Sequence, residues 1–280
     1  MIMLKQAVRK AITLMPRSRL LAACCRYYCE HCGDSRREIS SDSATNGELR
    51  LLREVAAQLD VVLDVGANVG DWTASVVALR PTATIHAFEP CRSAYDVFLR
   101  RGFPDGVTAH RIALSSRAGT SPLYVFGEAF GLNSLHNRYG LEDGYGIGPA
   151  DKTEDVPCQT IDAFCRDHSL RRVDFMKVDT EGHEIDVLQG SIDSLRSGIL
   201  RRVQFEYGGT YIDSRRLLKD AFDAFKDLEY ALFRIVPNGL VAHLRYDQRL
   251  ETFQYNNFVA LHRDTIESTP SAIMALRQAR

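Results

Sequence analysis

The chain has 280 residues, of which 45% are hydrophobic and 25% charged, a composition typical of a soluble globular protein. Its formal net charge of −1 carries no signature of nucleic-acid binding, so we expect no nucleic-acid partner. No stretch reaches the roughly 20 apolar residues that span a bilayer. The seven cysteines form no regular disulfide framework, which favours a reducing, cytoplasmic setting.

The first 45 residues form a basic extension ahead of the main domain. Its short apolar run at residues 11–15 is flanked and interrupted by charge, unlike a signal peptide. We expect a helix that packs on its own domain, with peripheral contact to a membrane surface as the alternative. Cys25, Cys29, His31 and Cys32 carry zinc-binding atoms, but their spacing matches no closed zinc site, and we expect no metal there.

Hydrophobic periodicity predicts a regular alternation of strands and helices in the main domain, which we place at residues 46–265. The predicted strands are residues 61–65, 84–88, 107–114, 173–178, 203–207, 230–236 and 257–261, with a hairpin extension at 240–244. The predicted helices are residues 48–59, 69–79, 93–101, 185–195 and 216–228. This alternation implies βαβ crossovers, so the fold class is a doubly wound α/β sheet. Residues 266–280 form a tail, predicted as a weakly held helix.

The stretch at residues 115–157 interrupts this rhythm, apart from a short strand expected at residues 123–126. Residues 127–148 are rich in glycine, asparagine and tyrosine, and a long irregular insert in a compact domain is usually functional. We therefore predict a lid or substrate loop, in which Asn133, Ser134 and His136 contact the acceptor. A solvated loop is the alternative for these residues.

The end of the first predicted strand carries a glycine turn. Asp64 precedes Gly66 and Gly70, and a ligand of a doubly wound fold sits beyond such strand ends. The middle glycine of the dinucleotide fingerprint is missing, which counts against a nicotinamide oxidoreductase. A carboxylate at this turn repels phosphate but suits the sulfonium and ammonium groups of S-adenosylmethionine. Glu89 closes the second strand, where a carboxylate can accept hydrogen bonds from both ribose hydroxyls.

Two stretches of the sequence resemble a known family. Residues 62–70, followed by Phe88-Glu89-Pro90, resemble the cofactor half of class I methyltransferases. The run at residues 173–184 resembles the hallmark of the FkbM family, approximately D-x-x-K-x-D-x-E-G-x-E. The matching residues are Asp174, Lys177, Asp179, Glu181, Gly182 and Glu184. The resemblance extends over about residues 61–261.

This resemblance implies a Rossmann-like class I methyltransferase sheet of seven strands, the last of them antiparallel. It implies that S-adenosylmethionine is bound by Asp64, Gly66, Ala67, Asn68, Gly70, Glu89, Pro90, Ala113 and Asp179. The expected activity is O-methylation of a hydroxyl on a sugar, glycan or natural-product acceptor. An N- or carboxyl-methyltransferase, or a protein that binds the cofactor without turnover, stays open as an alternative. The oligomeric state is left open as well.

Methyl transfer to a hydroxyl requires alignment and the removal of one proton. Asp179, Glu181 and His183 follow the fourth strand and are the predicted catalytic residues. His183 stands where the family commonly has a small residue. Its ordinary pKa makes it a plausible base near neutral pH, with a capping role as the alternative. Glu206 ends the next strand and is expected to contact substrate. Together with Asp179 it offers oxygen ligands for a divalent cation, although we predict no metal. Lys177 is expected to form a structural salt bridge.

Overall fold

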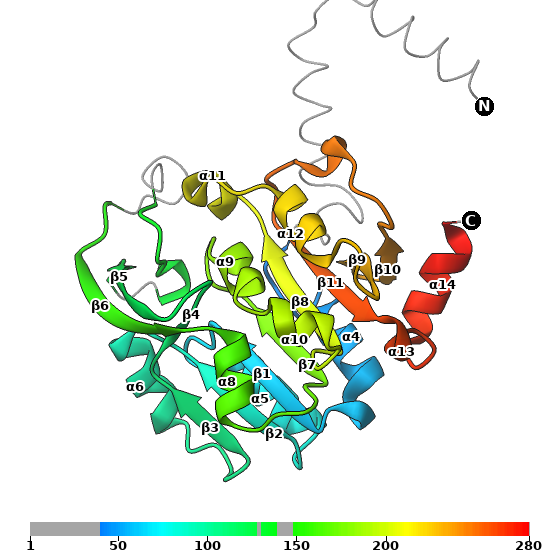
Figure 1. The fold of residues 1–280 in the computed structure, drawn as a ribbon. Coiled ribbons are helices and arrows are strands. Elements are labelled where there is room, and N and C mark those ends of the chain that lie inside the picture. The colour runs from blue at the N-terminus through cyan, green and yellow to red at the C-terminus, as the bar shows by residue number, and fades with distance from the viewer. Residues whose placement is uncertain (1–39, 128–129, 139–147, 280) are drawn as a thin grey trace, which may run out of the picture.

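The computed structural model describes residues 40–127, 130–138 and 148–279 (Figure 1). The predictions for the N-terminal helix, its membrane contact and its cysteines fall outside these residues, as does part of the predicted lid. Within the described ranges, every helix is too short or too polar to cross a membrane. Cys91, Cys158 and Cys165 are buried free thiols.

The described residues are organised around an eight-stranded sheet with the order β10-β9-β11-β8-β7-β1-β2-β3. These strands are β1 (Val61–Val65), β2 (Thr84–Phe88), β3 (Val107–His110), β7 (Phe175–Val178), β8 (Arg202–Tyr207), β9 (Tyr230–Val236), β10 (Gly239–Ala242) and β11 (Asn256–His262). From β3 to β8 all neighbours are parallel, whereas β11 is antiparallel to both β8 and β9. After β1 the chain adds β2 and β3 on one side of β1, and it then continues with β7 on the other side. The strand order therefore switches between β1 and β7.

The main sheet contains the seven predicted strands and one more. Seven were expected, and the eighth is β10, the hairpin extension, which pairs antiparallel with β9 at the sheet edge. The expected strand at residues 107–114 is also divided in two. Its first half is β3 in the main sheet, and its second half is β4 (Ala113–Leu114), which belongs to a separate sheet.

That separate sheet has the order β4-β6-β5 and lies in the stretch expected to be irregular. It contains β5 (Gly119–Val125) and β6 (Lys152–Gln159), which pair antiparallel along their whole length. β5 includes most of the short strand expected at residues 123–126, whereas β6 was not predicted, because most of its residues are exposed or half-buried and it carries no apolar run. The sheet is stabilised by pairing between segments separated by the insert, and the local sequence gives no sign of that pairing.

Helices cover both faces of the main sheet. One face carries α8 (Ile161–Asp167), α9 (Glu184–Gln189), α10 (Ile192–Arg196) and α12 (Leu218–Phe225), which lie in front of the strands in Figure 1. The other carries α4 (Glu48–Val55), its continuation η1 (Ala56–Gln58), α5 (Asp71–Leu79) and α14 (Pro270–Gln278). The other helices of the described residues are α6 (Arg92–Arg100), η2 (Phe130–Leu132), α11 (Thr210–Ser214), η3 (Gln248–Leu250) and α13 (Arg263–Ile266). The tail helix is α14, and it is packed rather than weakly held, because Ala272 and Ala275 are buried.

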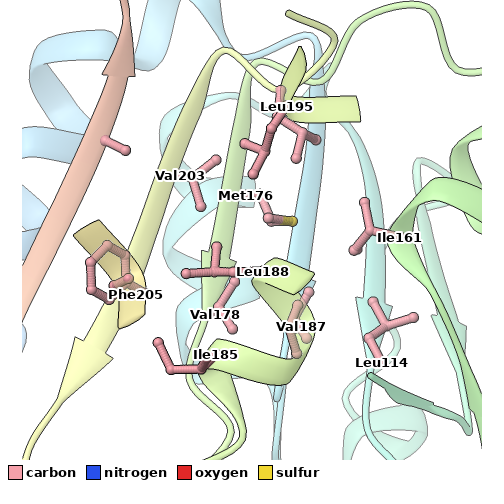
Figure 2. Packing of buried hydrophobic residues seen from close by; sticks show 14 of the residues in the cluster. Leu114, Ile161, Met176, Val178, Ile185, Val187, Leu188, Leu195, Val203 and Phe205 are labelled. Carbon is pink, nitrogen blue, oxygen red and sulfur yellow. The ribbon is translucent and has the colours of Figure 1, made fainter. Parts of the chain in front are cut away.

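The hydrophobic core is divided by the sheet into two layers. Figure 2 shows the layer below α9, where Ile185 and Leu188 pack over Val178 of β7 and Phe205 of β8. Burial on both faces explains why these strands read as nearly continuous apolar runs. Side chains of β1 alternate between the layers, so that Val65 faces the α9 side while Val62 faces α4 and α5.

Three imidazoles lie together at α8, where His86 is buried, His110 is half-buried and His168 is exposed. The Nδ1 atom of His86 lies 3.1 Å from Nε2 of His110, and His168 stacks on Phe164 with ring centroids 4.1 Å apart. Burial and the neighbouring imidazoles lower the pKa of His86 and His110 from 6.5, that of His110 to about 4. As the pH falls, the unfolded chain therefore takes up protons on these groups before the folded chain does.

We expect the free energy of unfolding to depend on this imidazole pair below about pH 6.5. Its stabilisation is complete above that pH and is lost as the pH falls towards 4, the folded-state pKa of His110. The variant His110→Phe should therefore lose less stability than the wild-type chain between about pH 7 and about pH 5. Urea denaturation at several pH values measures the free energy of unfolding of both proteins. The contribution of carboxylate titration is common to both and cancels when the two pH profiles are subtracted. Parallel pH profiles would contradict the prediction.

Candidate functional site

A cavity of about 460 Å³ opens at the carboxyl ends of β1, β2 and β7, beside the point where the strand order switches. Most of the predicted site residues line it. From the cofactor prediction these are Gly66, Ala67, Asn68, Glu89, Pro90, Ala113 and Asp179, and from the catalytic and substrate predictions Asn133, Ser134, Glu181 and His183. Asp64, Gly70, His136 and Glu206 do not line it.

The turn after β1 brings the backbone close to the neighbouring strand end. The amides of Gly66 and Ala67 both donate to the carbonyl oxygen of Phe88, at 3.0 and 2.9 Å. Gly66 has φ +84°, and a Cβ atom there would lie 1.7 Å from the carbonyl oxygen of Asp179. Only glycine fits this position. The turn therefore leaves an open cradle between β1, β2 and β7.

Gly70 serves packing rather than ligand contact. It has φ +91° and precedes α5 as its N-cap residue. A Cβ atom there would lie 2.8 Å from the Phe98 ring and 2.9 Å from the Phe103 ring. The glycine thus allows these rings to pack below the turn, outside the cavity wall.

Glu89 is fixed at the end of β2 by two backbone amides. Its Oε2 atom accepts from the Asn68 amide at 2.9 Å, and Oε1 accepts from the Cys91 amide at 2.8 Å. Burial raises the pKa of Glu89 to about 7, against the lowering effect of these two amides. Each oxygen retains a further lone pair. The carboxylate is therefore rigidly oriented and can accept hydrogen bonds from a ligand in the cavity.

Asp64 lies below the cavity, and its expected direct contact with the cofactor is not supported by its position. The pleat of β1 turns its side chain to the same face as Val62, where α5 packs. There it is completely buried, and Oδ2 accepts from the Thr73 hydroxyl at 2.5 Å. Burial raises the pKa of Asp64, while the Lys177 ammonium acts to lower it.

Three acidic side chains converge where β7 and β8 end. Carboxylate oxygens of Asp179, Glu181 and Glu206 lie within 4.8 Å of one another. Lys177 forms the expected salt bridge, with Nζ 2.6 Å from Oδ2 of Asp179, and it also lines the cavity. Arg138 approaches Oε2 of Glu181 to 2.8 Å. Two of the three acidic side chains thus each have a cationic partner.

The acidic side chains differ in protonation. Burial acts to raise the pKa of Asp179, but the Lys177 ammonium more than offsets this and leaves the pKa lowered. Burial and the charge of Asp179 raise the pKa of Glu206 well above its ordinary value, and they raise that of Glu181 to about 8. At neutral pH the group therefore combines an ionised Asp179 with protonated neighbours. Asp179 is the one of the three best suited to accept a proton.

His183 is a weaker base than the sequence predicted. It is buried as the N-cap residue of α9, and burial lowers its pKa to about 4. Its Nδ1 atom lies 3.0 Å from Nε2 of His136, and its Nε2 atom lies 2.9 Å from the Ser115 hydroxyl. The lowered pKa keeps the ring neutral near neutral pH, and the partners on both ring nitrogens fix its position.

The described part of the predicted substrate loop is bonded to the hallmark turn. The Ser134 hydroxyl donates to the carbonyl oxygen of Glu181 at 2.7 Å and accepts from the His136 amide at 3.0 Å. Asn133 Oδ1 accepts from the Phe126 amide at 3.0 Å. Asn133 and Ser134 form part of the cavity wall, and a freely solvated loop is not what the structure shows for this segment.

Sequence reasoning missed Glu48, a carboxylate that lines the cavity from the first turn of α4. It is buried and accepts from the side chains of Asn46 at 2.6 Å, Asn257 at 3.0 Å and Gln204 at 2.6 Å. Tyr255, also in the cavity wall, lies 3.0 Å from the Asn257 amide group. Glu48 stood out only as the start of a helix, since its partners on β8 and β11 are remote in sequence.

The strand order and the glycine turn at its switch point define a Rossmann-like class I methyltransferase fold. Residues 64–234 match the Methyltransferase FkbM domain, and the chain belongs to this family of methyltransferases.

Three relatives illustrate the family. The chain is 31% identical to Methyltransferase sdnD of Sordaria araneosa, over 59% of this chain and 74% of that protein. It is 27% identical to Hexuronic acid methyltransferase AglP of Haloferax volcanii, over 62% and 67% of the two chains. It is also 27% identical to 2-O-methyltransferase NoeI of Sinorhizobium fredii, over 52% and 65%. Methyltransferase FkbM from Methylobacillus flagellatus is a structural neighbour with 16% identity and a TM-score of 0.45, over 72% of this chain and 43% of that one.

Proposed function

We propose that the chain transfers the methyl group of S-adenosylmethionine to a hydroxyl of a sugar, glycan or natural-product acceptor. The observation that carries the proposal is Glu89, whose two carboxylate oxygens are fixed by backbone amides in the wall of the cavity. One relative, a 2-O-methyltransferase, supports an oxygen acceptor by its name, and another, a hexuronic acid methyltransferase, supports an acceptor of the sugar class.

The residues present fit this cofactor. Glu89 can accept hydrogen bonds from the ribose diol, and the cradle beside Gly66 gives the backbone close access to the methionine end. Ala113 and Leu114 provide an apolar wall for the adenine. The cavity volume lies in the range of small-molecule sites. When bound, S-adenosylmethionine supplies a methyl group on a positively charged sulfonium.

Acidic side chains at one end of the cavity can accept the proton that the acceptor hydroxyl loses. Asp179 is ionised, lines the cavity and is oriented by Lys177, so it can accept a proton from an acceptor hydroxyl. Glu181 has a raised pKa and can donate a hydrogen bond to another acceptor oxygen. Transfer to nitrogen or to a carboxyl group is the second candidate for the same cavity, since an ionised carboxylate serves those acceptors as well.

Calorimetric titration of the full chain with S-adenosylmethionine and S-adenosylhomocysteine tests the proposal. We expect binding of both in the micromolar range, and labelled methyl transfer to hydroxyl-bearing sugars in an acceptor screen. Amine-only and carboxyl-only acceptors in the same screen separate the second candidate. A folded chain that binds neither compound but binds NAD(H) would overturn the proposal.

A further inference from the structure

A second group of potential ligands lies behind the cavity wall, apart from the acidic side chains. It consists of His136 from the substrate loop together with His183 and Asp186 of the hallmark segment. One ring nitrogen of each histidine and one carboxylate oxygen all lie within 4.8 Å of one another. The mechanism proposed above uses none of these atoms to move a proton.

The distances among these atoms fit a single small ion. Nε2 of His136 lies 3.0 Å from Nδ1 of His183, which in turn lies 3.8 Å from Oδ2 of Asp186. In a tetrahedral centre with bonds of about 2.1 Å, neighbouring ligand atoms are roughly 3.4 Å apart. The two observed distances lie on either side of that value. Both imidazoles have lowered pKa values because they are buried, so both are neutral and have a lone pair available.

The surroundings hold these three side chains in place, as metal ligands usually require. The other ring nitrogen of His183 is 2.9 Å from the Ser115 hydroxyl, which can accept its N–H and leave Nδ1 unprotonated. Arg216 donates to both carboxylate oxygens of Asp186, at 2.9 and 3.0 Å. A carboxylate oxygen has a further lone pair, so these bonds orient Asp186 and leave it able to bind an ion.

We propose that His136, His183 and Asp186 form a three-ligand site for a divalent transition metal such as Zn²⁺. Two imidazoles and one carboxylate are a ligand set that favours zinc, nickel or cobalt over magnesium. Three protein ligands leave one coordination position for a water molecule, and of the three ligands only His183 lines the cavity. The site does not depend on the proposed methyl transfer.

Two other groups of side chains lack the combination of imidazoles and a carboxylate that this site has. His86 and His110 approach to 3.1 Å, but the side chains packed against them are imidazole and phenyl rings rather than a carboxylate. Asp179, Glu181 and Glu206 offer carboxyl groups only, and Lys177 and Arg138 already pair with two of them.

Cobalt titration of the full chain, after dialysis against a chelator, tests the proposal. We expect one Co²⁺ per chain, with the visible absorption of a four-coordinate nitrogen and oxygen site, displaced by Zn²⁺. His136→Ala and Asp186→Asn should each weaken this binding at least about 100-fold. The matched control is His110→Ala, which alters the other imidazole pair and should bind Co²⁺ like the wild-type chain.

Cysteine ligands need a separate control because Cys25, Cys29 and Cys32 lie in the N-terminal extension. The double variant Cys29→Ser and Cys32→Ser should retain the cobalt spectrum. Thermal unfolding of each variant shows whether it is folded, and S-adenosylhomocysteine titration of the same samples reports on the proposed function separately. The proposal is overturned if the wild-type chain binds no Co²⁺ or Zn²⁺. It is also overturned if binding survives in folded His136→Ala but is lost in the cysteine variant.

Discussion

Replacing Glu89 by alanine is expected to weaken S-adenosylhomocysteine binding by about 100-fold or more. A hydrogen bond to a charged group contributes about 1.5–3 kcal/mol. Loss of an acceptor for two ribose hydroxyls therefore corresponds to about 3–6 kcal/mol, at about 1.4 kcal/mol for each tenfold change in affinity. The amides of Asn68 and Cys91 also lose their acceptor, so the turn that shapes the cradle is less firmly held. Calorimetric titration measures the change in dissociation constant.

Two further variants make this prediction specific. Glu89→Gln keeps one acceptor oxygen and should weaken binding by about tenfold. Glu229→Ala removes a half-exposed carboxylate that pairs with Arg263 and should bind like the wild-type chain. An affinity for Glu89→Ala close to that of Glu229→Ala, in a folded protein, would show that the carboxylate does not hold the ligand.

Gly66→Ala is expected to destabilise the fold by at least about 3 kcal/mol, or to prevent folding. The new Cβ atom would lie 1.7 Å from the carbonyl oxygen of Asp179, so β1 and β7 would have to separate at their ends. This strain adds to the cost of φ +84° for a residue with a side chain. Urea denaturation at neutral pH measures the loss.

Gly102→Ala is the matched control for this substitution. Gly102 also has positive φ, +64°, but nothing lies within 4 Å of a Cβ atom built there. We expect a loss of about 1–2 kcal/mol, which is the conformational cost alone. If the two variants were equally stable, the close approach of the turn to β7 would have no energetic role.

The sequence predicted best the features whose signal is local. The strands at residues 61–65, 84–88 and 230–236 were predicted with the bounds of β1, β2 and β9, because each is a short apolar run between turns. Gly66 and Glu89 were found because a turn and a strand end mark their positions. Membership of the FkbM family was predicted from a contiguous run of residues and is confirmed.

Features that depend on remote pairing could not be predicted in this way. Glu48 is placed by Gln204 and Asn257, which are 156 and 209 residues away along the chain. The strand β6 is recognisable only through its partner β5, since its own residues are largely polar. The weak basicity of His183 is likewise a consequence of burial, which the composition of the turn does not reveal.

The position of β11 determines the order in which the sheet can be completed during protein synthesis. This strand lies between β8 and β9, although it follows both of them in the chain. While residues 256–262 are still inside the ribosome, the hairpin of β9 and β10 has no strand through which to join β8. Until then β8 presents an open edge to other chains. Completion of the sheet therefore waits for residues 256–262, however early β1 and β2 come together.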